Sequence, residues 1–301
     1  MRVASFFSGI GGFDLGFQNA GHEVVFQCEN NQFCIDVLND HWPQVLKAKD
    51  IREVLNDETI IPEADLWCGG FPCQDVSLAR ASSRAGLRGA KSGLFYPFAE
   101  LISQRLPRVV VIENVPGLLS SNRGGDFAVI LQTLASCGYA VGWRVLNSRY
   151  FGIPQQRQRV FIVGCYRNPS GVAQILFEPE RGGGDITAGH QSKQKLVSAF
   201  KESVGDFAKG PIVQKLGYCL AATAGRHTGT DWSRTYVSYP DKVRRLTPEE
   251  AERLQGFPTK WTLPLAYQGD KAEQWDTPRY HALGNAVSVP VAEWLAHRLL
   301  L

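Results

Sequence analysis

Short apolar runs alternate with helical patterns through the first half of the chain. Five runs are typical of buried strands, at residues 3–7, 23–28, 65–67, 109–112 and 160–163. Helical spacing of apolar positions is found in residues 97–105 and at Phe127, Ile130, Leu131 and Leu134. Strands that alternate with helices in this way predict an α/β fold with a doubly wound, mostly parallel sheet.

The pattern changes after residue 166. Up to residue 241 few positions are periodic, and the glycine-rich stretch 181–184 interrupts them, which predicts a loop-rich, mainly β module. We therefore predict two domains, a larger one formed by residues 1–175 and completed by 278–301, and a smaller one formed by 176–277.

Two helices are predicted near the C-terminus. One begins at Thr247, which is followed by Pro248 in the first turn and by Glu250 at capping-box spacing. The other spans the apolar residues 290–301, which must pack on a larger body.

Composition supports a folded chain of this size and excludes several classes of protein. At 301 residues and 44% hydrophobic, the chain can bury a full α/β core and a smaller second unit. The seven cysteines form no C-x-x-C pair and have no histidines at metal-ligand spacing, so neither disulfides nor a metal site are predicted. No apolar stretch approaches the length of a membrane span or signal peptide, so a cytoplasmic protein is expected. The net charge of +3 does not by itself identify a nucleic-acid binder.

The loop at residues 7–12, between the first strand and the first helix, is rich in glycine. Glycines at this position let the backbone turn tightly against a ligand, which favours a nucleotide-type cofactor. Asp14 stands where the dinucleotide fingerprint has its third glycine, so a pyrophosphate cofactor is disfavoured. Glu29 ends the second strand, roughly 20 residues past Gly9, where an acid can accept ribose hydroxyls. An ordinary turn or a solvated carboxylate explains each feature alone, but together they favour an adenosine-containing ligand, whose amine Asp50 could bind.

Cys73 follows a proline and precedes a basic, glycine-punctuated loop. Between residues 76 and 99 there is no acid, and the charged side chains are Arg80, Arg84, Arg88 and Lys91. A cysteine is most often a small buried hydrophobic residue, but these flanks favour an accessible thiol activated by positive charge. The loop is either a solvated surface segment or one that closes onto phosphates, which its uniform charge suits.

Glu113 ends an apolar strand at the carboxyl edge of the sheet, where open α/β sheets bind ligands. A carboxylic acid there can hydrogen-bond a ring nitrogen, and a turn cap is the alternative. Arg157 and Arg159 alternate into the next strand, so both are expected on one face. They could bind a carbonyl and a phosphate, or be edge-strand arginines without a ligand.

A thiol, an acid and two guanidiniums on separate segments are suited to alkylating an unsubstituted pyrimidine carbon, whose neighbouring carbon must first accept a thiolate. The segments run in the order 7–12, Pro72-Cys73-Gln74, Glu113-Asn114-Val115, Gln155-x-Arg157-x-Arg159, 245–250 with 254–258, and Gly284-Asn285-Ala286-Val287. In this order they resemble the cytosine-C5 DNA methyltransferases of prokaryotes and phages. The likeness covers nearly the whole chain except about residues 166–241.

The resemblance implies an S-adenosylmethionine-dependent methyltransferase fold, in which residues 176–277 form the target-recognition domain. It implies that S-adenosylmethionine is the methyl donor and that the target cytosine is flipped out of duplex DNA. Cys73 would attack C6, Glu113 would hold N3 and C5 would take the methyl group. Arg159 would contact the base carbonyl, and Arg157 would support the thiol and a phosphate. The implied cofactor contacts are Phe7, Gly9, Gly11, Gly12, Leu15, Glu29, Asp50, Ile51, Phe71, Asn285 and Val287.

Contacts to DNA are expected from two parts of the chain. Near the catalytic motifs they are Gln74, Ser77, Arg80, Arg84, Arg88, Lys91 and Gln155. In the segment 224–235 they are Arg226, His227, Thr228, Trp232 and Arg234. Arginine offers a bidentate geometry to guanine, which favours base reading in this segment. A polar hairpin loop in which the tryptophan only packs is the alternative.

Two other functions remain open. An RNA cytosine-C5 methyltransferase would use nearly the same motifs, although the Cys-Phe-Thr tripeptide typical of those relatives does not occur in the sequence 166–241. A catalytically silent DNA-binding regulator would not need the intact catalytic motifs. The expected partners are duplex DNA and a cognate restriction endonuclease acting on the same site, and we expect a monomer that does not associate with membranes.

Overall fold

A computed structural model describes residues 1–72, 92–177, 203–204, 211–224, 234–267 and 272–299. Contacts within the chain divide it into two compact units. The first contains residues 1–147, 158–178 and 286–301, and the second contains residues 148–157 and 179–285. The predicted domains differ from this division chiefly at residues 148–157 and 278–285, which belong to the second unit and not to the larger one.

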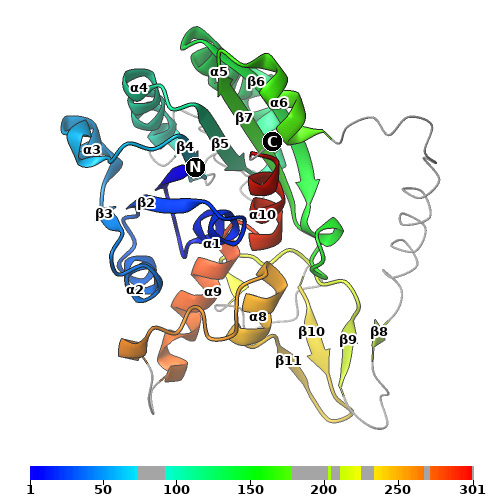
Figure 1. Ribbon diagram of the computed structural model, residues 1–301. Helices are drawn as coiled ribbons and strands as arrows, with labels where there is room; N and C mark the ends of the chain where they lie inside the picture. The colour runs from blue at the N-terminus through cyan, green and yellow to red at the C-terminus, as the bar shows by residue number, and fades with distance from the viewer. Residues whose placement is uncertain (73–91, 178–202, 205–210, 225–233, 268–271, 300–301) are drawn as a thin grey trace. The chain divides into compact units, whose positions relative to one another are not determined.

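The first unit is built on a seven-stranded sheet, counted over the described residues (Figure 1). Its strands are β1 (Arg2–Phe6), β2 (Glu23–Cys28), β3 (Leu46–Ala48), β4 (Leu66–Gly69), β5 (Val109–Asn114), β6 (Tyr139–Asn147) and β7 (Gln158–Tyr166). They lie in the order β3-β2-β1-β4-β5-β7-β6. The first five run parallel, and β7 is antiparallel to both of its neighbours. The predicted doubly wound, mostly parallel sheet is confirmed.

Helices connect these strands and cover both faces of the sheet. They are α1 (Gly12–Asn19), α2 (Gln32–His41), α3 (Ile51–Asn56), α4 (Phe95–Arg105), α5 (Gly125–Ser136), α6 (Pro169–Leu176) and α10 (Val289–Arg298), with the 3-10 helices η1 (Glu58–Ile60), η3 (Ser92–Leu94) and η4 (Pro116–Gly124). Helix α6 lies where the sequence predicts a loop-rich stretch. The Asn168 side chain caps it by accepting the Gly171 N–H, and Pro169 occupies its first turn.

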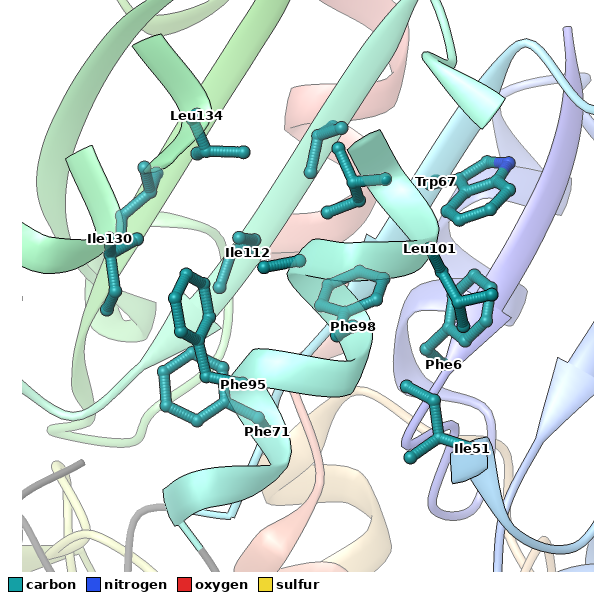
Figure 2. Close-up of a cluster of buried hydrophobic side chains, with 14 of the residues drawn as sticks. Phe6, Ile51, Trp67, Phe71, Phe95, Phe98, Leu101, Ile112, Ile130 and Leu134 are labelled. Atoms are coloured by element: carbon teal, nitrogen blue, oxygen red, sulfur yellow. The ribbon is translucent and has the colours of Figure 1, made fainter. Parts of the chain in front are cut away.

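The face of the sheet covered by α3, α4 and α5 holds the main hydrophobic core of the first unit (Figure 2). The ring centroid of Phe6 in β1 lies 4.9 Å from those of Trp67 and Phe98. Phe71, just after β4, packs on Phe95 at 5.5 Å. Aromatic pairs at such separations stabilise a core beyond the area they bury. The core therefore fixes the strand ends from which the neighbouring loops emerge.

On the opposite face, α1 packs closely against α10. Gly16 makes this possible, because a Cβ atom there would lie 2.6 Å from the Ala292 Cβ and 2.8 Å from the Glu293 nitrogen. The C-terminal helix is thus held against the first helix of the chain, and both belong to the first unit.

The second unit contains a small antiparallel sheet in the order β11-β10-β9-β8. Its elements are β8 (Ser203–Val204), β9 (Ile212–Gln214), β10 (Tyr236–Ser238), β11 (Val243–Arg245), α8 (Pro248–Gln255), α9 (Asp276–Asn285), η5 (Ser148–Tyr150), η7 (Leu265–Tyr267) and η8 (Ala272–Trp275). Helix α8 begins at the predicted capping box, in which Thr247 and Glu250 each accept the other's N–H. A buried ion pair of 3.0 Å between Arg279 and Glu252 ties α9 to α8.

Gly16→Ala should destabilise the first unit. Alanine at a helical glycine gains about 0.5–1 kcal/mol, but overpacking against α10 costs about 1–3 kcal/mol, so the free energy of unfolding should fall. Urea denaturation measures it. Ala292→Gly should weaken the effect of Gly16→Ala in the double variant, since it removes the nearest clashing atom. A Gly16→Ala variant as stable as the wild type would contradict the close packing of α1 and α10.

Candidate active site

Five parallel strands end at one edge of the sheet in the first unit, and a predicted site residue follows or ends each of them. In chain order these are the loop 7–12 after β1, Glu29 after β2, Asp50 after β3, Phe71 after β4 and Glu113 in β5. The strand order reverses between β1 and β4. Open α/β sheets bind ligands at the carboxyl edge beside such a reversal. The sheet therefore gathers residues that are up to 106 positions apart in the sequence.

The glycines of the loop 7–12 have different surroundings. A Cβ atom at Gly11 would lie 2.5 Å from the ring of Trp42, and one at Gly12 would lie 2.4 Å from the Val287 carbonyl oxygen. At Gly9 nothing lies within 4 Å of the same position. Gly11 and Gly12 thus admit packing partners of the first unit, whereas Gly9 leaves open space for a ligand.

The backbone of this loop is left-handed at three positions. The φ angles are 53° at Phe7, 57° at Gly9 and 83° at Gly11. Such a conformation is unfavourable for phenylalanine, and strain of this kind is found mainly at functional sites. The ring of Phe7 contacts Phe98 edge-on, with centroids 5.9 Å apart. Leu15, half-buried in the first turn of α1, donates its N–H to the Gly11 carbonyl at 2.9 Å.

Glu29 is joined directly to the glycine loop. One carboxylate oxygen accepts the N–H of Gly9 and the other accepts that of Asn31, both at 2.8 Å. Burial raises the pKa of the Glu29 carboxyl above its usual value of 4.5. Asp50 caps α3 by accepting the Arg52 N–H at 2.9 Å and remains half-buried. Both acids therefore lie at the edge where the resemblance expects an adenosine group.

The remaining predicted cofactor residues have different environments. Phe71 is buried and its carbonyl accepts the Asn114 side-chain N–H at 3.2 Å, while Ile51 and Val287 are also buried in the first unit. Asn285 belongs to the second unit, where it is exposed and lies 3.4 Å from a ring nitrogen of His281.

Glu113 and Arg159 form an ion pair in the first unit. The distance from Arg159 Nε to Glu113 Oε1 is 2.9 Å, and the side chains are only 17% and 10% exposed. The antiparallel pairing of β5 with β7 produces this contact, because it aligns Glu113 with Phe161, two residues after Arg159. A carboxylate and a guanidinium with this little solvent are suited to holding a flat polar group through hydrogen bonds.

Arg157 does not share the environment of Arg159. It precedes β7, belongs to the second unit and is almost fully buried. Its guanidinium donates to the carbonyls of Leu220 at 3.2 Å and Gly284 at 3.1 Å, and lies 3.5 Å from the Cys219 sulfur. The two arginines, which were expected on one face, therefore have different partners.

Gln155 is also placed differently from the prediction of a DNA contact. Its side chain is fully buried in the second unit. The amide nitrogen donates to the Leu254 carbonyl at 2.7 Å, and the amide oxygen accepts the Leu220 N–H at 3.0 Å. This geometry favours a role in holding the backbone of the second unit. The side chain has no exposed surface that could contact DNA.

Arg234 lies at the end of the segment predicted to read bases. One guanidinium nitrogen donates to the hydroxyl of Thr223, the residue that precedes the segment, at 2.9 Å. The other predicted residues of the thiol motif, the basic loop and the reading segment lie outside the described residues: Cys73, Gln74, Ser77, Arg80, Arg84, Arg88, Lys91, Arg226, His227, Thr228 and Trp232.

Asp14 is a site feature whose role the sequence does not reveal. It is fully buried behind the glycine loop, and its carboxylate accepts from Ser5 Oγ at 2.9 Å and Gln27 Nε2 at 2.8 Å. Burial raises the pKa of the Asp14 carboxyl to about 6. Its position in the sequence pointed to this residue, because Asp14 stands where the dinucleotide fingerprint has its third glycine.

Two features are absent from the described residues. Within them, no helix has the length and apolar character needed to cross a membrane. In the same ranges, histidine, cysteine and acidic side chains form no group of three or more arranged to hold a metal ion.

Comparison with known proteins gives consistent matches over nearly the whole chain. The profile of the C-5 cytosine-specific DNA methylase family matches residues 1–178 and 185–300. The chain is 33% identical over 307 residues to the type II methyltransferase M2.BsuMI of Bacillus subtilis, covering 99% of the chain and 75% of that protein. It is 32% identical over 311 residues to the type II methyltransferase M.NgoBI of Neisseria gonorrhoeae, covering 97% and 90%.

Solved structures show the same fold at lower identity. The methyltransferase EhMeth of Entamoeba histolytica matches with a TM-score of 0.70 and 19% identity. The Dnmt2 methyltransferase of S. pombe matches with a TM-score of 0.69 and 19% identity. Each match covers 100% of the chain and 98% of the other protein. The predicted methyltransferase fold is thereby confirmed.

Asp14→Asn should gain stability relative to the wild type as pH rises. Because the pKa of Asp14 is raised from 3.8 to about 6, the folded chain binds this proton more tightly than the unfolded chain. The ionised carboxylate therefore opposes folding above pH 6 by about 3 kcal/mol, and this penalty disappears below about pH 4. Asparagine does not titrate, so the difference in unfolding free energy between the two proteins should change by that amount. Urea denaturation at pH 4 and pH 7 is the measurement, and an equal difference at both would contradict it.

Proposed function

The chain belongs to the C-5 cytosine-specific DNA methylase family, and we propose that it transfers a methyl group from S-adenosylmethionine to carbon 5 of a cytosine flipped out of a specific duplex DNA sequence. It is a DNA (cytosine-5)-methyltransferase, related over most of its length to type II methyltransferases. The observation that supports this proposal most directly is the Glu113–Arg159 pair. It lies at the sheet edge that also holds the glycine loop and Phe71, two residues before Cys73.

Cys73 is the proposed nucleophile. Its thiolate adds to C6 of the cytosine, which makes the electrons of the C5–C6 double bond available at C5. C5 would then form a bond to the methyl carbon as the bond between that carbon and the donor's sulfur breaks, which would leave a neutral thioether. A base removes the C5 proton, the double bond forms again, and the C6–S bond breaks to release the Cys73 thiolate. Extrusion of the base from the helix is needed because stacking covers both ring faces.

Glu113 and Arg159 are proposed to hold the base during this addition. A hydrogen bond donated by the protonated Glu113 carboxyl to N3 would withdraw electrons from the ring and favour attack at C6. Arg159 would donate to the base carbonyl. The two side chains already contact each other at 2.9 Å, so little rearrangement is needed to offer both groups to one edge of the ring. Arg157 donates to backbone carbonyls in the second unit. It is proposed to support the segment that leads into β7 and not to touch the base.

The acids at the sheet edge fit the proposed cofactor. Glu29 and Asp50 can accept hydrogen bonds from a ribose and an adenine amine, and Gly9 leaves the space beside them open. The buried carboxylate of Asp14 behind the same loop opposes a pyrophosphate and suits a cation. When bound, S-adenosylmethionine supplies an electrophilic methyl group on a positively charged sulfur.

Duplex DNA is the proposed substrate, and the second unit is proposed to select its sequence. The basic residues 80, 84, 88 and 91 would contact phosphates, and the segment 224–235 would contact base edges. Because the relatives are type II methyltransferases, a restriction endonuclease acting on the same site is the proposed companion. We further propose that the protein acts as a monomer in the cytoplasm.

Cys73→Ala should abolish covalent capture of the enzyme by duplex DNA that carries 5-fluorocytosine. Fluorine blocks loss of the C5 substituent while it permits addition of the thiolate, so the wild type should form a stable adduct. Denaturing gel electrophoresis detects that adduct. Cys137→Ala, which alters a half-buried thiol of the first unit, should retain it. An adduct formed by the Cys73 variant would sink the assignment.

Glu113→Gln should lower the single-turnover rate of methyl transfer by about 10²–10⁴, the usual contribution of a positioned proton donor. Cofactor affinity should change much less, because Glu29 and Asp50 provide the proposed cofactor contacts. Rapid-quench measurements on duplex DNA give the rate, and calorimetric titration gives the affinity. A rate near that of the wild type would make Glu113 a turn cap. Transfer to RNA instead of DNA would point to the RNA-modifying alternative.

A further inference from the structure

Gln155 and Arg157 hold the same backbone residue from two sides. The side-chain oxygen of Gln155 accepts the N–H of Leu220 at 3.0 Å, and Arg157 donates to the Leu220 carbonyl at 3.2 Å. Backbone hydrogen bonds of 2.7 and 2.8 Å join Gly217 to the residues on either side of Gln155. The stretch from residue 217 to 220 is therefore fixed in register on residues 154–157, entirely within the second unit.

The side-chain amide of Gln155 makes further hydrogen bonds within the second unit. Its nitrogen donates to the Leu254 carbonyl at 2.7 Å and to the Gln255 side-chain oxygen at 3.1 Å. The nitrogen of Gln255 in turn donates to the Leu283 carbonyl at 2.7 Å. Both glutamines are fully buried, and a buried polar group left without a partner costs about 1–3 kcal/mol. The two amides thus lock together residues 155, 220, 254–255 and 283.

Gly284 packs closely against the backbone of residues 221 and 222, which continue the same stretch. A Cβ atom there would lie 2.2 Å from the Ala222 nitrogen and 2.4 Å from the Ala221 carbonyl carbon. The Gly284 carbonyl also accepts from Arg157 at 3.1 Å. Residues 217–222 consequently have packing or hydrogen bonds on both sides.

This stretch leads into the segment proposed to read bases, and the described residues at both ends of that segment are joined to each other. The Tyr218 N–H donates to the Thr235 hydroxyl at 2.8 Å, and Arg234 donates to the Thr223 hydroxyl at 2.9 Å. Base-edge readout requires donors and acceptors to be held within about 0.5 Å of their working positions. A displacement of residues 217–222 would therefore be passed to both ends of the segment.

We propose that Gln155 is a positioning residue for target-site discrimination, which holds residues 217–222 so that the second unit presents its base-reading groups in one register. The inference rests on the proposed function and names a residue that sets its sequence specificity. Gln155 acts through Leu220 and touches neither the cytosine nor the cofactor. Its loss should relax discrimination between sites and leave the cofactor edge of the first unit intact.

Gln155→Met keeps the length of the side chain but removes the hydrogen bond to Leu220. We expect the ratio of kcat/KM for the preferred site to that for single-mismatch sites to fall about tenfold, the effect of one lost base contact. The affinity for S-adenosylmethionine should change by no more than about twofold, because changes at distant, independent sites usually do not affect each other. Methylation of a randomised duplex library, read by sequencing of 5-methylcytosine, gives the preference, and calorimetry gives the affinity. Gly284→Ala should relax discrimination as well, because it displaces the same stretch without removing a Gln155 hydrogen bond.

Thr262→Val is the matched control. Thr262 is fully buried in the same unit, where its hydroxyl bonds Glu252 and Arg279, away from residues 217–222. It should lower the unfolding midpoint yet keep the wild-type site preference. Undiminished discrimination by Gln155→Met, or an equal loss in Thr262→Val, would overturn the inference. A wild type that methylates no DNA in the library would instead overturn the proposed function, so the two failures are distinguishable.

Discussion

The close approach of two backbone segments at Gly12 and Val287 is the contact on which the cofactor edge depends. A Cβ atom at position 12 would lie 2.4 Å from the Val287 carbonyl oxygen, so one backbone would have to move. The contact continues where Gly16 meets Ala292 in α10. The C-terminal segment therefore holds the glycine loop from one side, while Glu29 and Trp42 contact it from others. Residues 12 and 287 are far apart in the sequence, and bringing such distant residues together is entropically unfavourable. The edge therefore forms together with the rest of the fold.

The apolar pattern predicts the layers of the first unit because strands buried on both faces read as continuous apolar runs. It also predicts the start of α8, since a capping box is a local pattern. It does not reveal α6, although Asn168 and Pro169 mark its start, because the glycine-rich stretch that follows dominates the composition of that region. Nor does it tell which glycine of the loop stays open. That depends on Trp42 and Val287, whose places are set by tertiary packing.

The arginine motif shows that residues alternating along the sequence can have very different partners. Residues 155, 157 and 159 alternate, and alternation puts side chains on one face only within a strand. Strand β7 begins at Gln158, so Arg159 follows the sheet to Glu113, whereas Gln155 and Arg157 bond Leu220 in the other unit. Their partner is more than sixty residues away in the sequence, so only tertiary structure can assign their roles. The motif locates candidate residues, and the strand boundary separates the group proposed to touch the base from the groups that organise the second unit.

Buried acids beside the glycine loop oppose folding but favour the proposed donor. Burial raises the pKa of both Asp14 and Glu29, which means that each carboxylate is less stable there than in water. In a region of low dielectric, a buried negative charge attracts a cation more strongly than it would in solvent. Transfer of the methyl group turns the positively charged sulfur into a neutral thioether, so this attraction is present for the donor and lost for the product. The carboxylates that reduce stability at neutral pH would therefore favour binding of the donor and release of the spent cofactor. This is an energetic reason for an acid at position 14, where the dinucleotide fingerprint has glycine.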